Sequence, residues 1–432
     1  MSVEAKCFLC GKGGNFSCQM CNSVQSCSKY HLSFHSKGDN CFPFQILEKP
    51  VIGRCVVANR DISAGEYLLY DSTTIYGPRN GGDESAITEG TFPSNLEAQT
   101  KLLNKRAKYE DFYTLTELLI HHEIESEMSI NDSSNSASSP LKDLHNSSVK
   151  ELQRCNDLLD INALSLPIQG YRGFFPIFSF LSHSCNNNCR HVVKNEGDTY
   201  EVRLYSQRGI RRGEELTITY TNLLRPTYRR RAHLSNVWKF VCNCSRCADP
   251  SENGSYINAV KCPFCREGHL LPQKSSNYEV WYCTQCDKTV NQSDVEKMVD
   301  QLEGVLNDTP KDWVSIKDYL QSMKAYLHSH HYLQILAKRY LTQLLPLEDD
   351  FLRQRMSLVE ELLHIFDILD SGKSASRGCT LYERGRTQLA SGLIPEGISS
   401  LKEAKACLEV EDENQSPQGR IKRNIQEILK QI

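Results

Sequence analysis

Apolar positions along the chain follow two different patterns. Before residue 222 they come in short alternating runs, as over 52–58, 62–70 and 216–220, and this period of two predicts β-strands. The last of these runs ends in a tyrosine, Tyr220. After residue 295 apolar residues recur every three or four positions, which predicts helices over 312–327, 332–345, 351–369, 381–390 and 398–408.

A segment of different composition interrupts the strand-rich part. Residues 96–124 and 149–159 have helical spacing, whereas residues 129–148 are rich in serine and asparagine and are expected to be disordered. We therefore predict a helical insertion over about 80–165 with a mobile loop inside it.

Composition excludes some classes of protein. The 432 residues include 50 Lys plus Arg and 53 Asp plus Glu, and the net charge of -3 gives no reason to expect nucleic-acid binding. No run of about 18 apolar residues predicts a membrane span. The polar start of the chain does not resemble a signal peptide. Residues 225–231 form the one basic run, which we expect to be the solvated start of a helix, with a patch for nuclear import or an acidic partner as the alternative.

The 19 cysteines are candidate metal ligands. Most of them fall in close Cys-x-x-Cys pairs, a spacing that suits zinc thiolates and is a poor disulfide framework. The chain is therefore expected in a reducing compartment, the nucleus and/or the cytoplasm.

Two regions carry zinc-ligand spacing outright. Residues 7–41 hold eight candidate ligands, enough for two four-coordinate sites: Cys7, Cys10, Cys18, Cys21, Cys27, His31, His35 and Cys41. Residues 257–290 have zinc-ribbon spacing, with Cys262, Cys265, Cys283 and Cys286. A third cluster, Cys242, Cys244 and Cys247, needs a fourth ligand from elsewhere.

The stretch from Ser179 to Asn188 contains a His-Ser-Cys triplet, His183 to Cys185, after an aromatic run. Together with the strand ending in Tyr220 and the cluster at 242–247, it resembles the closing half of a SET methyltransferase domain. Residues 7–41 resemble a MYND zinc finger. In this order, the motifs are similar to those of the SET and MYND domain (SMYD) family, in the branch expanded in arthropods.

The resemblance implies an α+β fold built around a β-rich, pseudo-knotted SET domain over residues 46–222. The MYND finger would occupy 1–45, a post-SET zinc cluster 223–250 and the zinc ribbon 257–290. C-terminal helical hairpins of tetratricopeptide (TPR-like) type would fill 295–432, with Gly392 and Ala404 at the spacing of one hairpin.

The resemblance also implies site residues. S-adenosyl-L-methionine would contact Gly53, Arg54, Asn162, Ser182, His183 and Tyr220, and the hydroxyl of Tyr220 would be catalytic. One MYND zinc would bind Cys7, Cys10, Cys27 and His31, and the other Cys18, Cys21, His35 and Cys41. Cys185 would complete the post-SET site, with Cys189 as its competitor, so that about four structural zinc ions are expected.

Some residues of the SET part depart from the family pattern. Cys55 replaces the second glycine of the family's Gly-x-Gly, Ser182 replaces an asparagine, and Trp238 stands where relatives often have tyrosine. A Cβ at position 55 is expected to crowd the cofactor.

These departures leave two functions open. The first is a monomeric protein-lysine N-methyltransferase acting on histone or non-histone lysines in transcriptional repression. The second is a weak or inactive adaptor whose MYND finger binds proline-containing peptides or corepressors. Its candidate contacts, Phe34, Phe42 and Phe44, could equally pack against the SET body.

Overall fold

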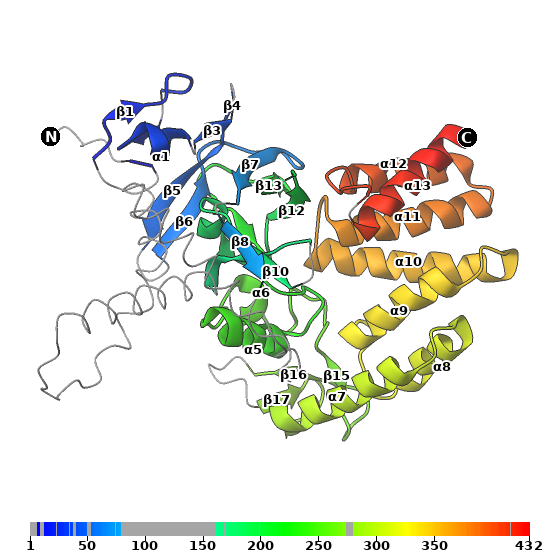
Figure 1. Ribbon diagram of the computed structural model, residues 1–432. Coiled ribbons are helices and arrows are strands. Elements are labelled where there is room, and N and C mark those ends of the chain that lie inside the picture. The colour runs from blue at the N-terminus through cyan, green and yellow to red at the C-terminus, as the bar shows by residue number, and fades with distance from the viewer. Residues whose placement is uncertain are drawn as a thin grey trace, which may run out of the picture. The chain divides into compact units, whose positions relative to one another are not determined.

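The computed structural model describes most of the chain outside the predicted insertion (Figure 1). Described are residues 7–8, 13–22, 24–33, 35–37, 40–49, 53–73, 75–78, 161–167, 170–197, 199–273, 280–414 and 416–432. Nearly all of the predicted insertion, with its loop at 129–148, lies outside these residues. The chain forms two compact units, Met1–Ser182 with Asn188–Thr217, and His183–Asn187 with Ile218–Ile432.

The first unit begins with very short elements that surround the N-terminal cysteines. Strand β1 (Phe16–Ser17) pairs with β2 (Gln25–Ser26), helix α1 spans Lys29–Ser33, and β3 (Ser36–Lys37) pairs with β4 (Asn40–Cys41). Elements this short bury little apolar surface, so their arrangement depends on the cysteine and histidine side chains between them.

Antiparallel strands form the rest of the first unit. Strands β5 (Phe44–Lys49) and β6 (Gly53–Ala58) make a hairpin. A second sheet has the order β12 (Cys189–Asn195), β13 (Tyr200–Ser206), β7 (Tyr67–Ser72), and a third has β8 (Ile75–Pro78), β10 (Tyr171–Phe174), β9 (Leu164–Ser165). Leu68, Val202 and Leu204 are fully buried on these strands. The predicted alternation holds only in part, because the neighbours Leu68 and Leu69 are both buried.

The chain crosses from one unit to the other beside the His-Ser-Cys triplet. The 3₁₀ helix η2 (Phe178–Phe180) precedes β11 (Ser182–His183), and β14 (Thr217–Ile218) marks the return. The buried carboxylate of Asp71 on β7 accepts the amides of Ile177 and Phe178 at 2.7 and 3.0 Å and so caps the start of η2. The predicted strand over 216–220 is shorter than expected, because Thr219 and Tyr220 lie beyond its end.

The second unit contains a small sheet and a stack of helices. Helices α5 (Thr227–Trp238) and α6 (Ser245–Ala248) precede a sheet of order β15 (Val260–Lys261), β16 (His269–Pro272), β17 (Val280–Cys283), β18 (Thr289–Asn291). The helices that follow are α7 (Gln292–Asp308), α8 (Trp313–Met323), α9 (Tyr332–Leu344), α10 (Asp349–Leu369), α11 (Ala375–Ala390), α12 (Ile394–Cys407) and α13 (Pro417–Gln431), and consecutive ones lie against each other (Figure 1).

The helices predicted from the apolar spacing are present, but some of them begin or end at other residues than predicted. The helix predicted over 312–327 stops at Met323, because Leu327 forms a β-bridge with Val260. Helices α11 and α12 start earlier than predicted, at Ala375 and Ile394. They approach closely at Gly385, where an added Cβ would lie 2.7 Å from the Leu401 side chain. None of the helices described is long and apolar enough to span a bilayer.

Candidate functional site

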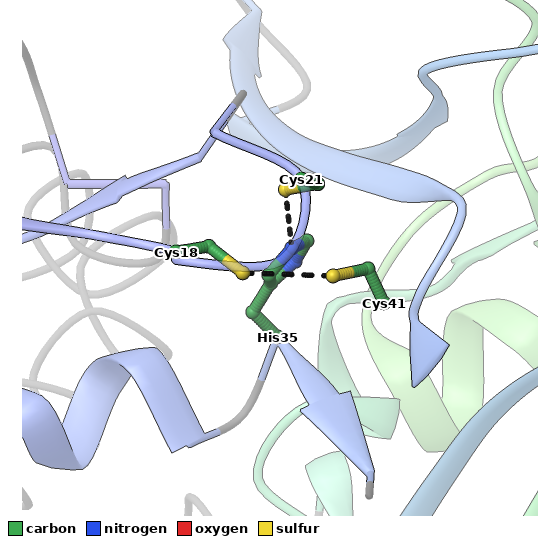
Figure 2. Close-up of side chains that lie close together, drawn as sticks. All are labelled: Cys18, Cys21, His35 and Cys41. Atoms are coloured by element: carbon green, nitrogen blue, oxygen red, sulfur yellow. Dashed lines mark hydrogen bonds between the residues drawn. The ribbon is translucent and has the colours of Figure 1, made fainter. Parts of the chain in front are cut away.

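The first cysteine–histidine cluster joins four predicted ligands. The ligand atoms of Cys18, Cys21, His35 and Cys41 all lie within 4.8 Å of one another (Figure 2). The Cys18 and Cys41 sulfurs are 3.5 Å apart, and the Cys21 sulfur is 3.2 Å from His35 Nε2. His35 is buried just after α1, and burial lowers the pKa of its imidazole, which keeps it in the neutral form that binds metal.

A second cluster interleaves with the first in sequence. Cys7 and Cys27 Sγ lie 3.5 and 3.3 Å from His31 Nδ1. Their proposed fourth partner, Cys10, lies outside the described residues. His31 lies on α1, whereas His35 lies beyond the end of this helix at Ser33. The two histidines belong to different clusters.

The third cluster joins Cys185 to Cys242, Cys244 and Cys247. Cys185 and Cys247 are 62 residues apart in sequence, and their sulfurs are 3.6 Å apart. Cys185 is fully buried. Cys189 belongs to the other unit, where its thiol donates to Asn188 Oδ1, so the structure brings Cys185 rather than Cys189 to this cluster.

The ribbon cysteines form the fourth cluster. The sulfurs of Cys262 and Cys286 are 3.8 Å apart, and those of Cys265 and Cys283 are 3.7 Å apart. A tetrahedral zinc with Zn–S bonds of about 2.3 Å places its sulfurs about 3.8 Å from one another. Thiolate and imidazole donors at these separations fit zinc in all the clusters.

Tyr220 belongs to a small aromatic group in the second unit. Its backbone amide donates to His183 Nδ1 at 3.0 Å, so Nε2 carries the ring proton and points at Cys185 Sγ, 3.2 Å away. Burial lowers the pKa of His183 to about 4, so the ring is neutral. The ring centroid of Tyr220 lies 5.1 Å from that of Trp238, the tryptophan that departs from the family pattern.

The other predicted cofactor contacts lie in the first unit. Gly53 and Arg54 begin β6, and the Arg54 guanidinium lies 6.0 Å from the centre of the Phe180 ring. The Asn162 carbonyl accepts the Ser179 hydroxyl at 3.4 Å, and Ser182 begins β11. His183 and Tyr220 belong to the second unit.

Cys55 is fully buried, and its thiol donates to the Leu47 carbonyl across the β5–β6 hairpin. The Cys55 side chain therefore packs within the hairpin and stabilises the pairing of its two strands. The expected crowding of the cofactor stays a prediction.

Sequence reasoning missed the polar groups that hold these segments. The buried Asn188 side chain donates to Glu214 Oε1 and the Glu215 carbonyl and accepts the Thr217 amide, which fixes the strand before Tyr220. Its place just after the His-Ser-Cys triplet was the available signal.

The basic run was misjudged. Arg230 in helix α5 is fully buried beside Cys185, so the prediction of a solvated run is wrong at this position. A run of arginines does not indicate which of them is buried, because that depends on which face of the helix packs against the rest of the protein.

Two of the phenylalanines proposed to grip a peptide are buried. Phe42 and Phe44 stack on each other with ring centroids 5.8 Å apart, and they are 6% and 1% exposed. The packing alternative is therefore the one the structure supports, while Phe34 lies outside the described residues.

Comparison with known proteins identifies the central domain. Residues 53–221 match the family model described as SET domain. The Drosophila melanogaster protein named SET domain-containing protein SmydA-8, isoform A, is 31% identical over 169 residues, which cover 37% of this chain and 35% of that protein. The Mus musculus protein named Histone-lysine N-methyltransferase SMYD3 is 39% identical over 85 residues, 20% of this chain and 19% of the relative.

The matched segments span about a third or less of these relatives. The match to the SET domain model, residues 53–221, contains the region in which His183, Cys185 and Tyr220 come together. Residues 53–221 thus match the SET domain model, and parts of the chain are similar to relatives named SmydA-8 and SMYD3.

Proposed function

We propose that this chain is an S-adenosylmethionine-dependent protein-lysine N-methyltransferase acting on histone or non-histone lysines. The observation that carries the proposal is the contact of the Tyr220 amide with a neutral His183 inside the matched SET domain. A relative named as a histone-lysine N-methyltransferase supports the same reaction class.

S-adenosylmethionine supplies an electrophilic methyl group when bound. By the SET resemblance, Gly53, Arg54, Asn162, Ser182 and His183 would hold it. The chain's own part is to bring a lysine amine out of water, because desolvation favours the neutral amine that can attack. Tyr220 would orient that amine through its hydroxyl, and the Trp238 ring beside it would narrow the lysine channel.

The reaction can be tested by transfer of tritiated methyl groups to a histone panel and to cell lysate proteins. Tyr220→Phe should lower turnover about 100-fold or more and leave cofactor affinity within about threefold, because the hydroxyl acts mainly in the transition state. Tyr326→Phe, at an exposed tyrosine of the second unit, is the matched control and should transfer at the parent rate. Parent activity that survives Tyr220→Phe would place the active site elsewhere.

We also infer four structural zinc ions: two in the N-terminal MYND-type clusters, one at the post-SET cysteines and one in the ribbon. Ligand atoms that lie within 4.8 Å of one another support this assignment. Elemental analysis of purified protein should return about four zinc ions per chain, and two or fewer would contradict the assignment. Replacing Cys283 and Cys286 by serine should remove one ion only.

The adaptor function is the second candidate, and one groove in the first unit favours it. A cavity of about 700 Å³ is lined by residues that include Phe42, Pro43, Tyr67 and Tyr205. Tyr67 is 39% exposed, and its ring centroid lies 5.4 Å from that of Tyr205. An exposed tyrosine beside a half-buried one suits a proline-rich peptide in the polyproline II conformation.

A labelled proline-rich peptide library tests the adaptor function. Binding that the full chain shows and Tyr67→Ala loses would support it, whereas no binding by either protein would contradict it. Transcriptional repression, a nuclear or cytoplasmic location and a monomeric state are further parts of the proposal. Light scattering and localisation of the tagged chain test the last two.

A further inference from the structure

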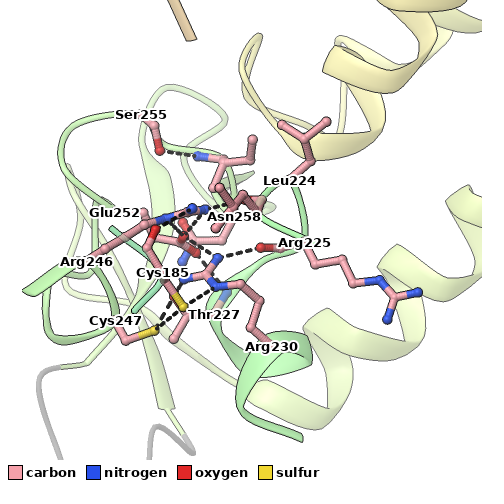
Figure 3. A network of polar contacts seen from close by, with 12 residues as sticks. Cys185, Leu224, Arg225, Thr227, Arg230, Arg246, Cys247, Glu252, Ser255 and Asn258 are labelled. Atoms are coloured by element: carbon pink, nitrogen blue, oxygen red, sulfur yellow. Dashed lines mark hydrogen bonds and ion pairs between the residues drawn. The ribbon is translucent and has the colours of Figure 1, made fainter. Parts of the chain in front are cut away.

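Three charged side chains are fully buried around the tetracysteine cluster of Cys185, Cys242, Cys244 and Cys247. They are Arg230, Arg246 and Glu252, each with no exposed surface (Figure 3). Buried charges are costly unless they are compensated, so this arrangement requires opposite charge nearby.

Arg230 contacts the sulfur atoms directly. Its Nε donates to Cys185 Sγ at 3.2 Å and its Nη2 donates to Cys247 Sγ at 3.4 Å. Its Nη1 donates to Glu252 Oε2 at 2.6 Å. The planar fork of one guanidinium thus places its positive charge against two of the four cluster sulfurs.

Arg246 sits between two ligands of the same cluster in sequence and holds its backbone. Its Nη2 donates to the Leu223 carbonyl at 2.7 Å and its Nη1 to the Cys185 carbonyl at 3.4 Å. Its Nε donates to Glu252 Oε2 at 2.9 Å. Glu252 therefore bridges both guanidinium groups and keeps them from repelling each other.

The guanidinium groups offset part of the ligand charge. A zinc ion with four thiolates carries a charge of about -2, and two guanidinium groups with one carboxylate carry +1. The sum is about one unit of negative charge. Without Arg230 the same buried, zinc-bound group would carry about two units of negative charge. The two N–H donors of Arg230 on Cys185 Sγ and Cys247 Sγ therefore stabilise the zinc-bound cluster.

We propose that Arg230 and Arg246 are positioning residues that retain the post-SET zinc by their charge. The inference rests on the proposed zinc site. Cys185 Sγ also lies against His183 Nε2, and His183 Nδ1 holds the Tyr220 amide. Loss of this zinc would therefore release the segment that positions Tyr220.

The test compares Arg230→Gln with Arg230→Lys in the full chain. Lysine keeps the charge, whereas glutamine keeps a hydrogen-bond donor without it. We expect Arg230→Gln to release one zinc ion to a colorimetric chelator 10–100-fold faster, the usual range for a lost outer-shell partner. Arg230→Lys should stay within about threefold of the parent. Arg225→Gln, on an exposed arginine that points away from the cluster in Figure 3, should match the parent.

The ion that is lost can be assigned by combining variants. Arg230→Gln in a chain whose ribbon cysteines are serine should lose a further zinc ion. Methyl transfer should fall with that ion and recover on adding zinc, which a merely structural lesion would not do.

Each outcome decides between charge and packing. Equal zinc release by the glutamine and lysine variants, or equal failure of both to fold, would overturn the charge role. Failure of Arg230→Gln alone to fold would support it. A Cys185→Ser variant that holds as much zinc as the parent would contradict the zinc site itself, independently of the arginines.

Discussion

The second unit holds two tetracysteine clusters that neutralise the same ligand charge in different ways. The ribbon cluster spans 24 residues of sequence, and the amides of Gly268, Gln285 and Cys286 donate to its sulfurs at 3.3–3.4 Å. The Cys185 cluster draws on ligands 62 residues apart and receives guanidinium groups instead. The ribbon cluster takes all of its ligands from one short stretch of sequence. The Cys185 cluster instead connects the His183 segment to residues 242–247, which are distant in sequence.

The comparison predicts where loss of zinc matters for function. Because His183 contacts Cys185 and holds the Tyr220 amide, a defect at Cys185 should reach the proposed methyl-transfer site. A defect in the ribbon should stay local.

The largest expected effect comes from comparing Cys185→Ser with Cys283→Ser. Each should lose about one zinc ion, but Cys185→Ser should lower methyl transfer more than 100-fold, since it removes the partner of His183. Cys283→Ser should keep transfer within about threefold. Zinc content and tritium transfer are measured on the same samples. Equal loss of activity in both variants would contradict the distinction between a local and a coupled cluster.

A smaller effect is expected at the ribbon turn. A Cβ added to Gly268 would lie 2.4 Å from Cys283 Sγ and 2.9 Å from Gln285 Cβ. Gly268→Ala should therefore speed zinc release from the ribbon about tenfold by displacing a sulfur ligand, and leave the Cys185 cluster unchanged. Chelator kinetics with two resolved phases would check this. Gly304→Ala is the control, because nothing lies within 4 Å of the added Cβ.

Two buried carboxylates show the same contrast: guanidinium groups donate to Glu252, whereas backbone amides donate to Asp71. Burial opposes ionisation of Glu252, but Arg230 and Arg246 outweigh it and lower its pKa. Asp71 accepts backbone amides, and burial raises its pKa from 3.8 to about 7.

Between those two pH values the unfolded chain releases the Asp71 proton while the folded chain retains it. The stability of the folded state therefore falls as pH rises from about 4 to 7.

The smallest expected effect tests this carboxylate. Asp71→Asn cannot titrate, so its melting temperature relative to the parent should rise between pH 5 and pH 8. One pKa unit corresponds to about 1.4 kcal/mol, and we expect a change of a few degrees. Thermal melts across this pH range measure it. A difference that is constant with pH would contradict the raised pKa of Asp71.

Sequence patterns predicted the clusters whose ligands are close together. The Cys-x-x-Cys pairs of the ribbon and the periodic helices after residue 295 follow from local spacing, and the structure shows both. The place of Cys185 depended on a family resemblance, because nothing in local spacing connects it to residues 242–247. The assignment of these clusters to zinc stays a prediction.

The supporting charges could not be predicted. Arg230 lies in a run of arginines that looked solvated, and Glu252 follows in a loop, so neither has a pattern that marks it as buried. Their burial follows from tertiary packing around a site assembled from distant segments. Asn188 ends the stretch that carries the His-Ser-Cys triplet, but its hydrogen bonds to Glu214 and Thr217 could be recognised only in the fold.

The central claim, a cofactor-dependent methyltransferase, is tested most directly by calorimetric titration of the full chain with S-adenosylmethionine. We predict saturable binding of about one cofactor per chain, retained by Tyr220→Phe and weakened about tenfold or more by His183→Ala. Absence of binding by the zinc-loaded parent would contradict the claim and leave the adaptor function as the better account.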